Sequence, residues 1–337
     1  MAQTVAPQIP VTQAMLDVAD KIARIFIPES RRQFDKVYPD KTKPARFVHY
    51  TSAEAALEII KTKRLRMRKT TCMVDYSEVQ HGHDLLQQIF TRNQQLRQRF
   101  IASLDACYAG LGNRAINEFD VKWADILLDT YVTSLSEHDA EDDLYGRLSM
   151  WRAFRSDQQR VALVVNIPAG SGAGLALGVV FAPASYAEID DAEREVGEIT
   201  QNIGENVSFL KTIPEAELSD AIVGFLKVLV VTRKHPAFKE EREWRVLYTP
   251  SQVSSPLMEP STDVVFGVPQ PVQRLPLDAV KSLLIGSLDL AAIFDRLIIG
   301  PTQYAAALTE AFAAALTSGG VTDAWNRIHL SKVPLRT

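Results

Sequence analysis

The sequence has only two cysteines among its 337 residues, Cys72 and Cys107. Two thiols cannot build the disulfide framework of a small secreted protein, so a reducing cytoplasm is the expected compartment. No apolar run approaches the roughly 18 residues that a membrane span requires. Residues 1–10 also lack the basic and apolar regions of a secretory signal. We therefore expect a soluble, cytoplasmic protein with no membrane partner.

The chain also lacks an excess of positive charge, because 37 Lys and Arg residues face 41 Asp and Glu residues, a net charge of −4. This balance gives no overall attraction to nucleic acid or to an anionic membrane, although a local basic patch stays open. A hydrophobic content of 46% and a charged content of 23% are ordinary for globular proteins. The length allows two domains, or one large domain with an insertion.

Many short strands and separate helices follow from the hydrophobic periodicity. Helices are predicted at residues 12–26, 51–62, 144–154, 187–204, 215–229 and 302–317. Strands are predicted at residues 46–51, 64–68, 130–135, 160–167, 179–181, 238–248, 264–268, 282–285, 296–299 and 327–330. Pro28 should end the first helix before a polar link, and residues 250–262 read as a surface loop. The pattern favours an α+β fold with a mixed, mostly antiparallel central sheet.

The sequence predicts that the chain divides into two parts. Residues 1–44 are expected to form an N-terminal helix and linker, and residues 45–337 a single α+β domain. Within it, residues 78–129 are polar, rich in Gln and Arg and free of strand signals, so they predict a helical insertion. Arg92, Arg97 and Arg99 could give this insertion a basic face for a nucleic-acid or acidic protein partner. A solvated helical cap is the alternative interpretation.

The acidic strand predicted at 238–248 is the first candidate for chemistry. Trp244 and Val246 fall on one face of this strand, whereas Glu241, Glu243 and Arg245 share the other. Paired carboxylates beside a guanidinium are suited to stabilising a developing cation and to accepting a proton. The alternative interpretation is a charged edge strand that prevents aggregation.

Other candidates lie earlier in the chain. His49, Tyr50 and Thr51 precede a predicted helix, where free backbone N–H groups could join them in a binding site. The helix at 144–154 sets Arg147 beside Trp151, which favours either an anion or ring-stacking site or a buried aromatic helix. The spacing of Cys72, His81 and His83 matches no strong zinc pattern, so no metal is expected. The Gly-rich stretch at 168–174 lacks the ending of a P-loop and predicts a hairpin turn with no helix after it.

Several short motifs follow one another in a recognisable order: His49-Tyr50-Thr51, Asp75-x-x-Glu78, Ser149-Met150-Trp151, Glu241-x-Glu243-Trp244-Arg245 and Ser-Lys-Val-Pro-Leu-Arg at 331–336. This order resembles a widespread bacterial domain family of unknown function, over about residues 45–337. The chain departs from that family at residues 73–78, where only the two acids of its usual Phe-Asn-Asp-Pro-x-Glu stretch remain.

Part of the pattern is also similar to ADP-ribosyltransferases, which have a His on the first core strand, an aromatic or Ser motif in the middle and a catalytic Glu on a late strand. That resemblance implies a split sheet and NAD as substrate. It implies that His49 holds the ribose and nicotinamide amide, with Tyr50 or Trp151 over the ring. Glu243 would stabilise the oxocarbenium ion, and Glu241 would position the acceptor. The remaining NAD-binding residues would be Thr51, Arg68, Arg147, Ser149 and Arg152.

The function expected from this resemblance is ADP-ribosylation of a macromolecule, nucleic acid or protein, by a bacterial toxin or anti-phage effector with a possible neutralising antitoxin. A non-enzymatic domain that binds a nucleotide or a partner protein is the alternative. A hydrolase that uses the carboxylates on a phosphodiester, with or without a metal, is the third hypothesis.

Overall fold

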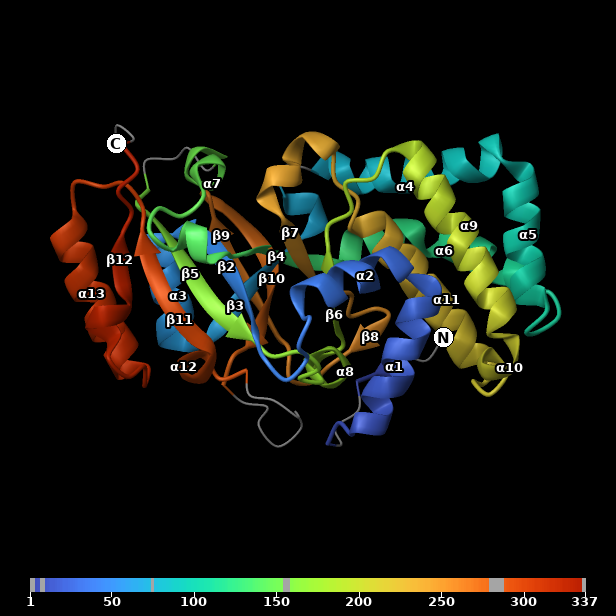
Figure 1. The fold of residues 1–337 in the computed structure, drawn as a ribbon, viewed down its shortest axis with the longest axis horizontal. Helices are drawn as coiled ribbons and strands as arrows, with labels where there is room; N and C mark the ends of the chain where they lie inside the picture. Colours follow the sequence, from blue (N-terminus) through green and yellow to red (C-terminus); the bar gives the residue numbers. More distant parts are fainter. Residues whose placement is uncertain (1–3, 7–9, 74–75, 154–157, 279–287, 335–337) are drawn as a thin grey trace.

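The computed structural model describes residues 4–6, 10–73, 76–153, 158–278 and 288–334. A large β-sheet fills the left part of the molecule in Figure 1, and a group of helices lies beside it on the right. Helix α13 (Ala305–Ser318) lies at the outer left, and α5 (Gln94–Asp105) lies at the opposite end. The mixture of helices with a mostly antiparallel sheet confirms the α+β class that the sequence predicts.

The main sheet contains strands β2 (Ala45–Ser52), β3 (Arg64–Lys69), β4 (Tyr131–Glu137), β5 (Arg160–Ile167), β6 (Val179–Pro183), β7 (Glu243–Tyr248), β9 (Glu259–Val265), β10 (Val268–Pro276), β11 (Phe294–Ile299) and β12 (Ile328–Leu330). Strands β1 (Thr4–Val5) and β8 (Val253–Ser254) pair separately. The other α-helices are α1 (Gln13–Phe26), α2 (Pro28–Val37), α3 (Ala53–Thr62), α4 (Tyr76–Arg92), α6 (Leu111–Asp129), α7 (Leu148–Ala153), α8 (Ala173–Leu177), α9 (Ile189–Glu205), α10 (Val207–Leu210), α11 (Glu215–Val231) and α12 (Leu290–Ile293). Short 3₁₀ helices are η1 (Thr70–Cys72), η2 (Ala140–Asp143), η3 (Pro236–Glu241) and η4 (Ala324–Arg327).

The sheet divides beside strand β4. The strand order is β12-β11-β5-β2-β4-β3-β10-β9, and β7 pairs with both β4 and β6. One edge of β4 pairs with β7 along residues 131–136. Its other edge meets β3 at Tyr131 and Val132 but β2 at Ser136 and Glu137. Strands β2 and β3 therefore diverge, and we call the opening between them the split.

The register assigns side chains to two faces of the sheet, because directly paired residues point to the same side. Ser136 pairs with Glu243 and Ser134 with Arg245. Leu135 pairs with Trp244. We call the side that carries Glu243, Arg245, Ser134 and Ser136 the Glu243 face; Val48 and Tyr50 also lie on it. We call the opposite side the Trp244 face, and it carries Phe47, His49 and Val246.

Helices α4, α5, α6, α9 and α11 form a helical lobe with a shared apolar core, which includes Phe100, Phe119, Ile199 and Leu226. The prediction of helices over residues 78–129 is thus correct for the described residues. Their partners, however, are α9 and α11, which the chain inserts between β6 and β7. The lobe is built from two separate segments because the amphipathic faces of α4–α6 need these later helices to cover them.

The N-terminal region differs from the sequence prediction. Thr12 caps α1 as expected, through Met15 N–H. Pro28, however, starts α2 where a link was predicted, because proline fits the first turn of a helix, where no backbone donor is needed. At the next helix, Ser52 accepts the capping bond from Ala55 N–H, so the helix begins after Ser52 and not after Thr51.

Three later segments also differ. The strand predicted at 238–248 begins only at Glu243, because residues 236–241 form η3 and Arg242 turns the chain with a φ of 46°. The predicted loop at 250–262 and strand at 264–268 are instead β8 and a β9–β10 hairpin that turns at Phe266 and Gly267. A short helix, α8, begins within the Gly-rich stretch, where only a hairpin turn was predicted. The strand predicted at 282–285 lies outside the described residues.

Lys227 on α11 provides a pH test of the lobe. It is 6% exposed, and its ammonium group bonds to two uncharged side chains, Thr249 and Gln252. Burial lowers the pKa of Lys227 from 10.5 to about 8. Since the unfolded chain binds the proton more tightly, raising the pH from 8 to 10 should stabilise the wild type by about 2 kcal/mol relative to Lys227→Met. Urea unfolding of both proteins measures this difference, and parallel pH profiles would contradict it.

Candidate functional site

Glu243, at the start of β7, is the centre of a buried group of charges. Its Oε1 accepts hydrogen bonds from the Ser134 hydroxyl and from Arg245 Nε, the latter at 3.0 Å. Its Oε2 accepts from Lys234 Nζ at 2.9 Å. Glu243 is 5% exposed and Arg245 3% exposed. The predicted pairing of Glu243 with Arg245 is therefore present, but β7 lies between β4 and β6 and is not an edge strand.

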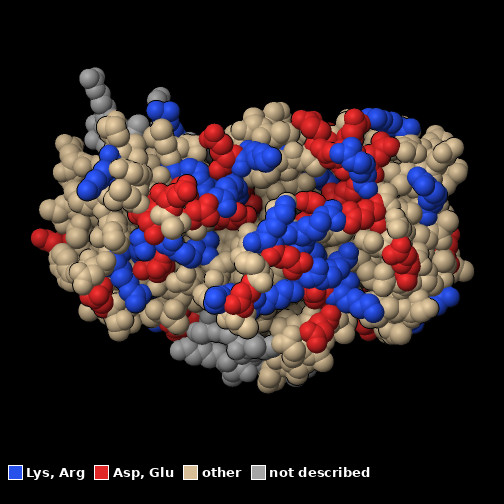
Figure 2. All heavy atoms as spheres, viewed as in Figure 1, with Lys and Arg blue, Asp and Glu red and all other residues tan. Residues whose placement is uncertain are grey.

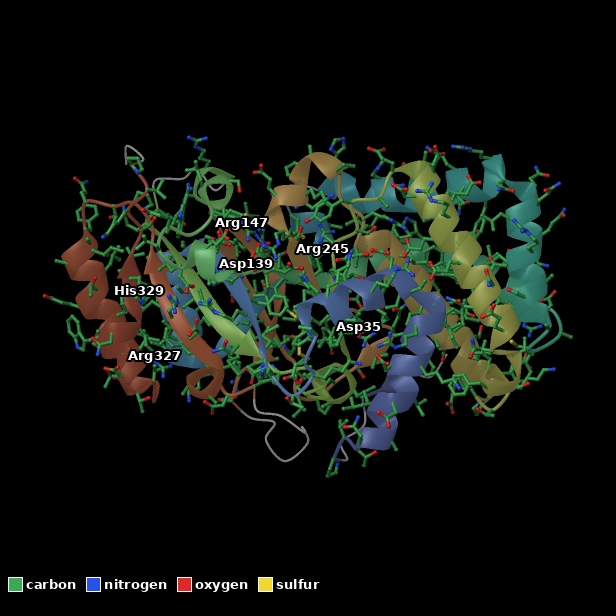
Figure 3. All side chains as sticks on the ribbon, in the orientation of Figure 1. Asp35, Asp139, Arg147, Arg245, Arg327 and His329 are labelled. Atoms are coloured by element: carbon green, nitrogen blue, oxygen red, sulfur yellow. The ribbon has the colours of Figure 1, made fainter. Side chains whose placement is uncertain are left out.

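The charges around Glu243 keep its carboxyl group ionised. Burial by itself would raise the pKa of Glu243, but the attraction of Arg245 and Lys234 lowers it from 4.5 to about 2. The same carboxylate, with Glu241, raises the pKa of Lys234 despite that lysine's burial. Arg245 also donates to the Val231 carbonyl at 2.6 Å, at the end of α11. In Figure 3, Arg245 accordingly lies between the sheet and the helical lobe.

Glu241 reaches this group from η3 and not from the strand. Its Oε2 accepts a hydrogen bond from Lys234 Nζ at 2.7 Å, so one ammonium joins the two carboxylates. The left-handed turn at Arg242 breaks the alternation that would have set Glu241 on the Glu243 face of a longer strand. The Glu241 side chain is 20% exposed, against 5% for that of Glu243. Glu241 is thus the more accessible of the two carboxylates.

Arg147 lies next to this group and holds the neighbouring loops together. Its guanidinium donates to the Glu241 carbonyl at 3.0 Å, the Glu137 carbonyl at 2.9 Å and the Asp142 carboxylate at 2.8 Å. Its backbone N–H donates to the Tyr50 hydroxyl at 2.8 Å. Figure 3 shows Arg147 beside the sheet, near Asp139. These contacts engage Arg147 with protein groups, whereas the resemblance to ADP-ribosyltransferases implied that it binds NAD.

Tyr50 and Trp151 are part of the core on the Glu243 face. Their rings meet edge to face at 5.0 Å, and Trp151 Nε1 donates to the Tyr145 carbonyl at 2.7 Å. Tyr50 is 7% and Trp151 3% exposed. Burial raises the pKa of Tyr50 to about 12. The two rings pack on each other. Of the two interpretations of the helix predicted at 144–154, this packing matches the buried aromatic helix and not a ring-stacking site.

The remaining predicted site residues are dispersed. Ser149 has a buried hydroxyl that bonds to no group among the described residues, whereas Arg152 is exposed. Thr51 lies near the end of β2, paired with Val161. Arg68 is held at the other end of β4 by Gln270, at 3.0 Å, and by the Cys72 carbonyl. The described contacts do not bring Arg68 or Thr51 to Glu243.

His49 lies at the split, on the Trp244 face of the sheet. It pairs with Leu163, and its Nδ1 lies 2.9 Å from the Ser134 carbonyl oxygen. Because a carbonyl can only accept, Nδ1 must carry the proton of this hydrogen bond. Burial lowers the pKa of His49, which favours the neutral ring. The imidazole thus bridges β2 and β4 where their backbone pairing has ended, and its Nε2 is left as an acceptor.

Ser134 is the residue that sequence reasoning missed. Its carbonyl accepts from His49, and its hydroxyl donates to Glu243, so one residue of β4 links both predicted residues. The side chains of His49 and Glu243 lie on opposite faces of the sheet. They therefore do not line one common pocket, as a single NAD site would require. The available signal was the alternation of Ser134 and Ser136 with apolar residues in a predicted core strand, which sets two hydroxyl groups on one face.

The structure also bears on the metal site and the basic face considered from the sequence, in the part of the chain that it describes. There, no three His, Cys, Asp or Glu side chains group to hold a metal ion. His83 instead stacks on Trp123 at 4.4 Å. In the proposed basic cluster, Arg92 pairs with Asp190 at 2.8 Å, Arg97 is half-buried and Arg99 is exposed. Figure 2 shows Lys and Arg gathered over α1 and α2 instead, with Asp and Glu among them.

Within the same described ranges, no helix combines the length and apolar character needed to cross a membrane. Comparisons of the chain with protein-family models, with curated proteins and with solved structures found no match. The family and the activity predicted from the motifs accordingly stay hypotheses.

Proposed function

We propose that the chain is an NAD-consuming enzyme similar to ADP-ribosyltransferases, which modifies a macromolecule. One observation carries the proposal: His49, Ser134 and Glu243 come from strands β2, β4 and β7 and are joined through Ser134. They follow the order that the resemblance implies, a His on the first core strand, a Ser in the middle and a Glu on a late strand. Ser134 thereby takes the middle position that the Ser149-Met150-Trp151 motif was expected to hold.

The proposed chemistry uses the ionised Glu243 carboxylate. When the bond between the nicotinamide nitrogen and the ribose breaks, positive charge develops on the ribose, and a fixed carboxylate stabilises that charge. A ribose hydroxyl would take the place of the Ser134 hydroxyl on Oε1 of Glu243. The more exposed Glu241 would then receive the proton of the acceptor, with Lys234 holding both carboxylates in position. His49 acts as a positioning residue through the backbone of Ser134.

The expected partners of this activity are NAD and a nucleic-acid or protein acceptor. A toxin or anti-phage effector of the bacterial cytoplasm, controlled by a neutralising antitoxin, is the biological setting that we propose for it.

The test is transfer of label from NAD to the components of a cell lysate, together with release of nicotinamide. Glu243→Gln should lower both rates about 100-fold, because it removes a contact that acts in the transition state. Ser134→Ala should reduce them less while leaving the ion pairs in place. Glu240→Gln is the matched control, since Glu240 is an exposed acid three residues earlier.

All rates are normalised to folded protein, measured by near-UV circular dichroism. Wild-type protein that leaves NAD intact, or Glu243→Gln protein with full activity, would refute the proposed function.

A further inference from the structure

A large cavity lies against the Trp244 face of the sheet, beneath the split. Its volume is about 920 Å³, near the upper end of the range of roughly 300–1,000 Å³ found for ligand pockets. Strands on both sides of the split contribute to its wall, with His49 from β2, Leu65 from β3 and Leu135 from β4. Helices α1 and α2 and the Gly-rich stretch before α8 enclose it from the other side.

The cavity opens beside α1. Among its lining residues, Gln13, Asp17, Lys41 and Gly170 are exposed, whereas the residues of the sheet are buried or half-buried. The buried wall is apolar and includes Leu163, Val165, Trp244 and Val246. A ligand that fills this space must therefore present a mainly apolar surface to it.

Among the described side chains of the sheet wall, one polar atom is left for such a ligand. Nδ1 of His49 is occupied by the Ser134 carbonyl, and no described group bonds to Nε2. Two other polar rings line the cavity and are already bonded: Tyr38 donates its hydroxyl to the Ile167 carbonyl at 3.2 Å, and Trp244 donates Nε1–H to Glu137 at 2.9 Å. Because Nδ1 carries the proton, Nε2 of the neutral ring accepts a hydrogen bond and cannot donate one.

We propose that this cavity binds a small, mainly apolar molecule with one hydroxyl or N–H donor, and that the donor bonds to Nε2 of His49. The ligand is distinct from the substrate proposed for Glu243. The cavity is on the opposite face of the sheet, and among the described residues that line it only Arg31 and Lys41, at the α1–α2 side, could offer a positive charge to a pyrophosphate. Arg31 is paired with Asp20 and lies over the Phe34 ring at 4.0 Å.

Two probes that differ in a single donor test this inference. Isothermal titration calorimetry would compare 4-pentylphenol, which has a hydroxyl donor, with 4-pentylanisole, in which a methyl group blocks it. Wild-type protein should bind the phenol about 3- to 10-fold more tightly than the ether, the usual net effect of one hydrogen bond. His49→Phe should remove this preference and leave the binding of the ether within about twofold, because the ring keeps its apolar contacts.

A second variant checks the location. Ala169→Trp places an indole in the cavity and should abolish binding of both probes, whereas Ala307→Trp on the exposed side of α13 should not. Circular dichroism confirms that each variant is folded. The inference is overturned if neither probe binds to wild type, if Ala169→Trp binds them normally, or if the phenol preference survives in His49→Phe. None of these outcomes depends on whether the protein consumes NAD.

Discussion

Trp244→Ala should lower the free energy of unfolding by about 3–5 kcal/mol, as large-to-small changes of fully buried aromatic residues do. Trp244 has no exposed surface. The centre of its ring lies 4.8 Å from that of Phe181, 5.3 Å from that of Phe47 and 6.4 Å from that of Phe34. The substitution removes packing between β7, β6, β2 and α2 together, and it also removes the bond from Nε1 to Glu137, 2.9 Å long.

Trp325→Ala is the matched control, because Trp325 is 58% exposed. Its free energy of unfolding should stay within about 0.5 kcal/mol of the wild type, as is usual for surface substitutions. Urea unfolding at neutral pH, followed by far-UV circular dichroism, measures both proteins. A loss below about 1 kcal/mol for Trp244→Ala would contradict the packing of α2 on this part of the sheet.

The same tryptophan shows what could be predicted from the sequence. Alternation in residues 243–248 correctly separates Trp244 and Val246 from Glu243 and Arg245, because a strand has a period of two. The pattern did not indicate that both faces are buried, since the helical lobe and helix α2 cover them from distant parts of the chain. Helix α2 itself was missed because its sequence is polar and begins with Pro28. Proline is found both just after the end of a helix and in the first turn of the next one.

The candidate site was predictable only within one strand. Arg245 lies two residues after Glu243, so their pairing follows from the local geometry of β7. Lys234 and Ser134 come from other segments, and only the tertiary fold brings them to the carboxylate. The sequence correctly placed His49 on a core strand. It could not show which face of the sheet His49 occupies, because the strand register decides that.

Glu243→Gln should destabilise the fold at neutral pH by about 3–5 kcal/mol, because it leaves two buried cations without their shared carboxylate. Arg245 and Lys234 both bond to Glu243, at 3.0 and 2.9 Å, and are 3% and 7% exposed. The exposed Glu240→Gln should change stability by no more than about 0.5 kcal/mol. Activity assays of Glu243→Gln therefore need a temperature at which this variant stays folded.

The pH dependence separates the charge of Glu243 from its packing. The folded pKa of about 2 lies below the unfolded value of 4.5, so the carboxylate stabilises the fold fully above pH 4.5. That contribution is lost as the pH falls toward 2, because the unfolded chain binds the proton first. The stability gap between wild type and Glu243→Gln should thus narrow by about 2 kcal/mol between pH 7 and pH 3. A gap that stays constant in urea unfolding over this range would mean that Glu243 contributes by shape and not by charge.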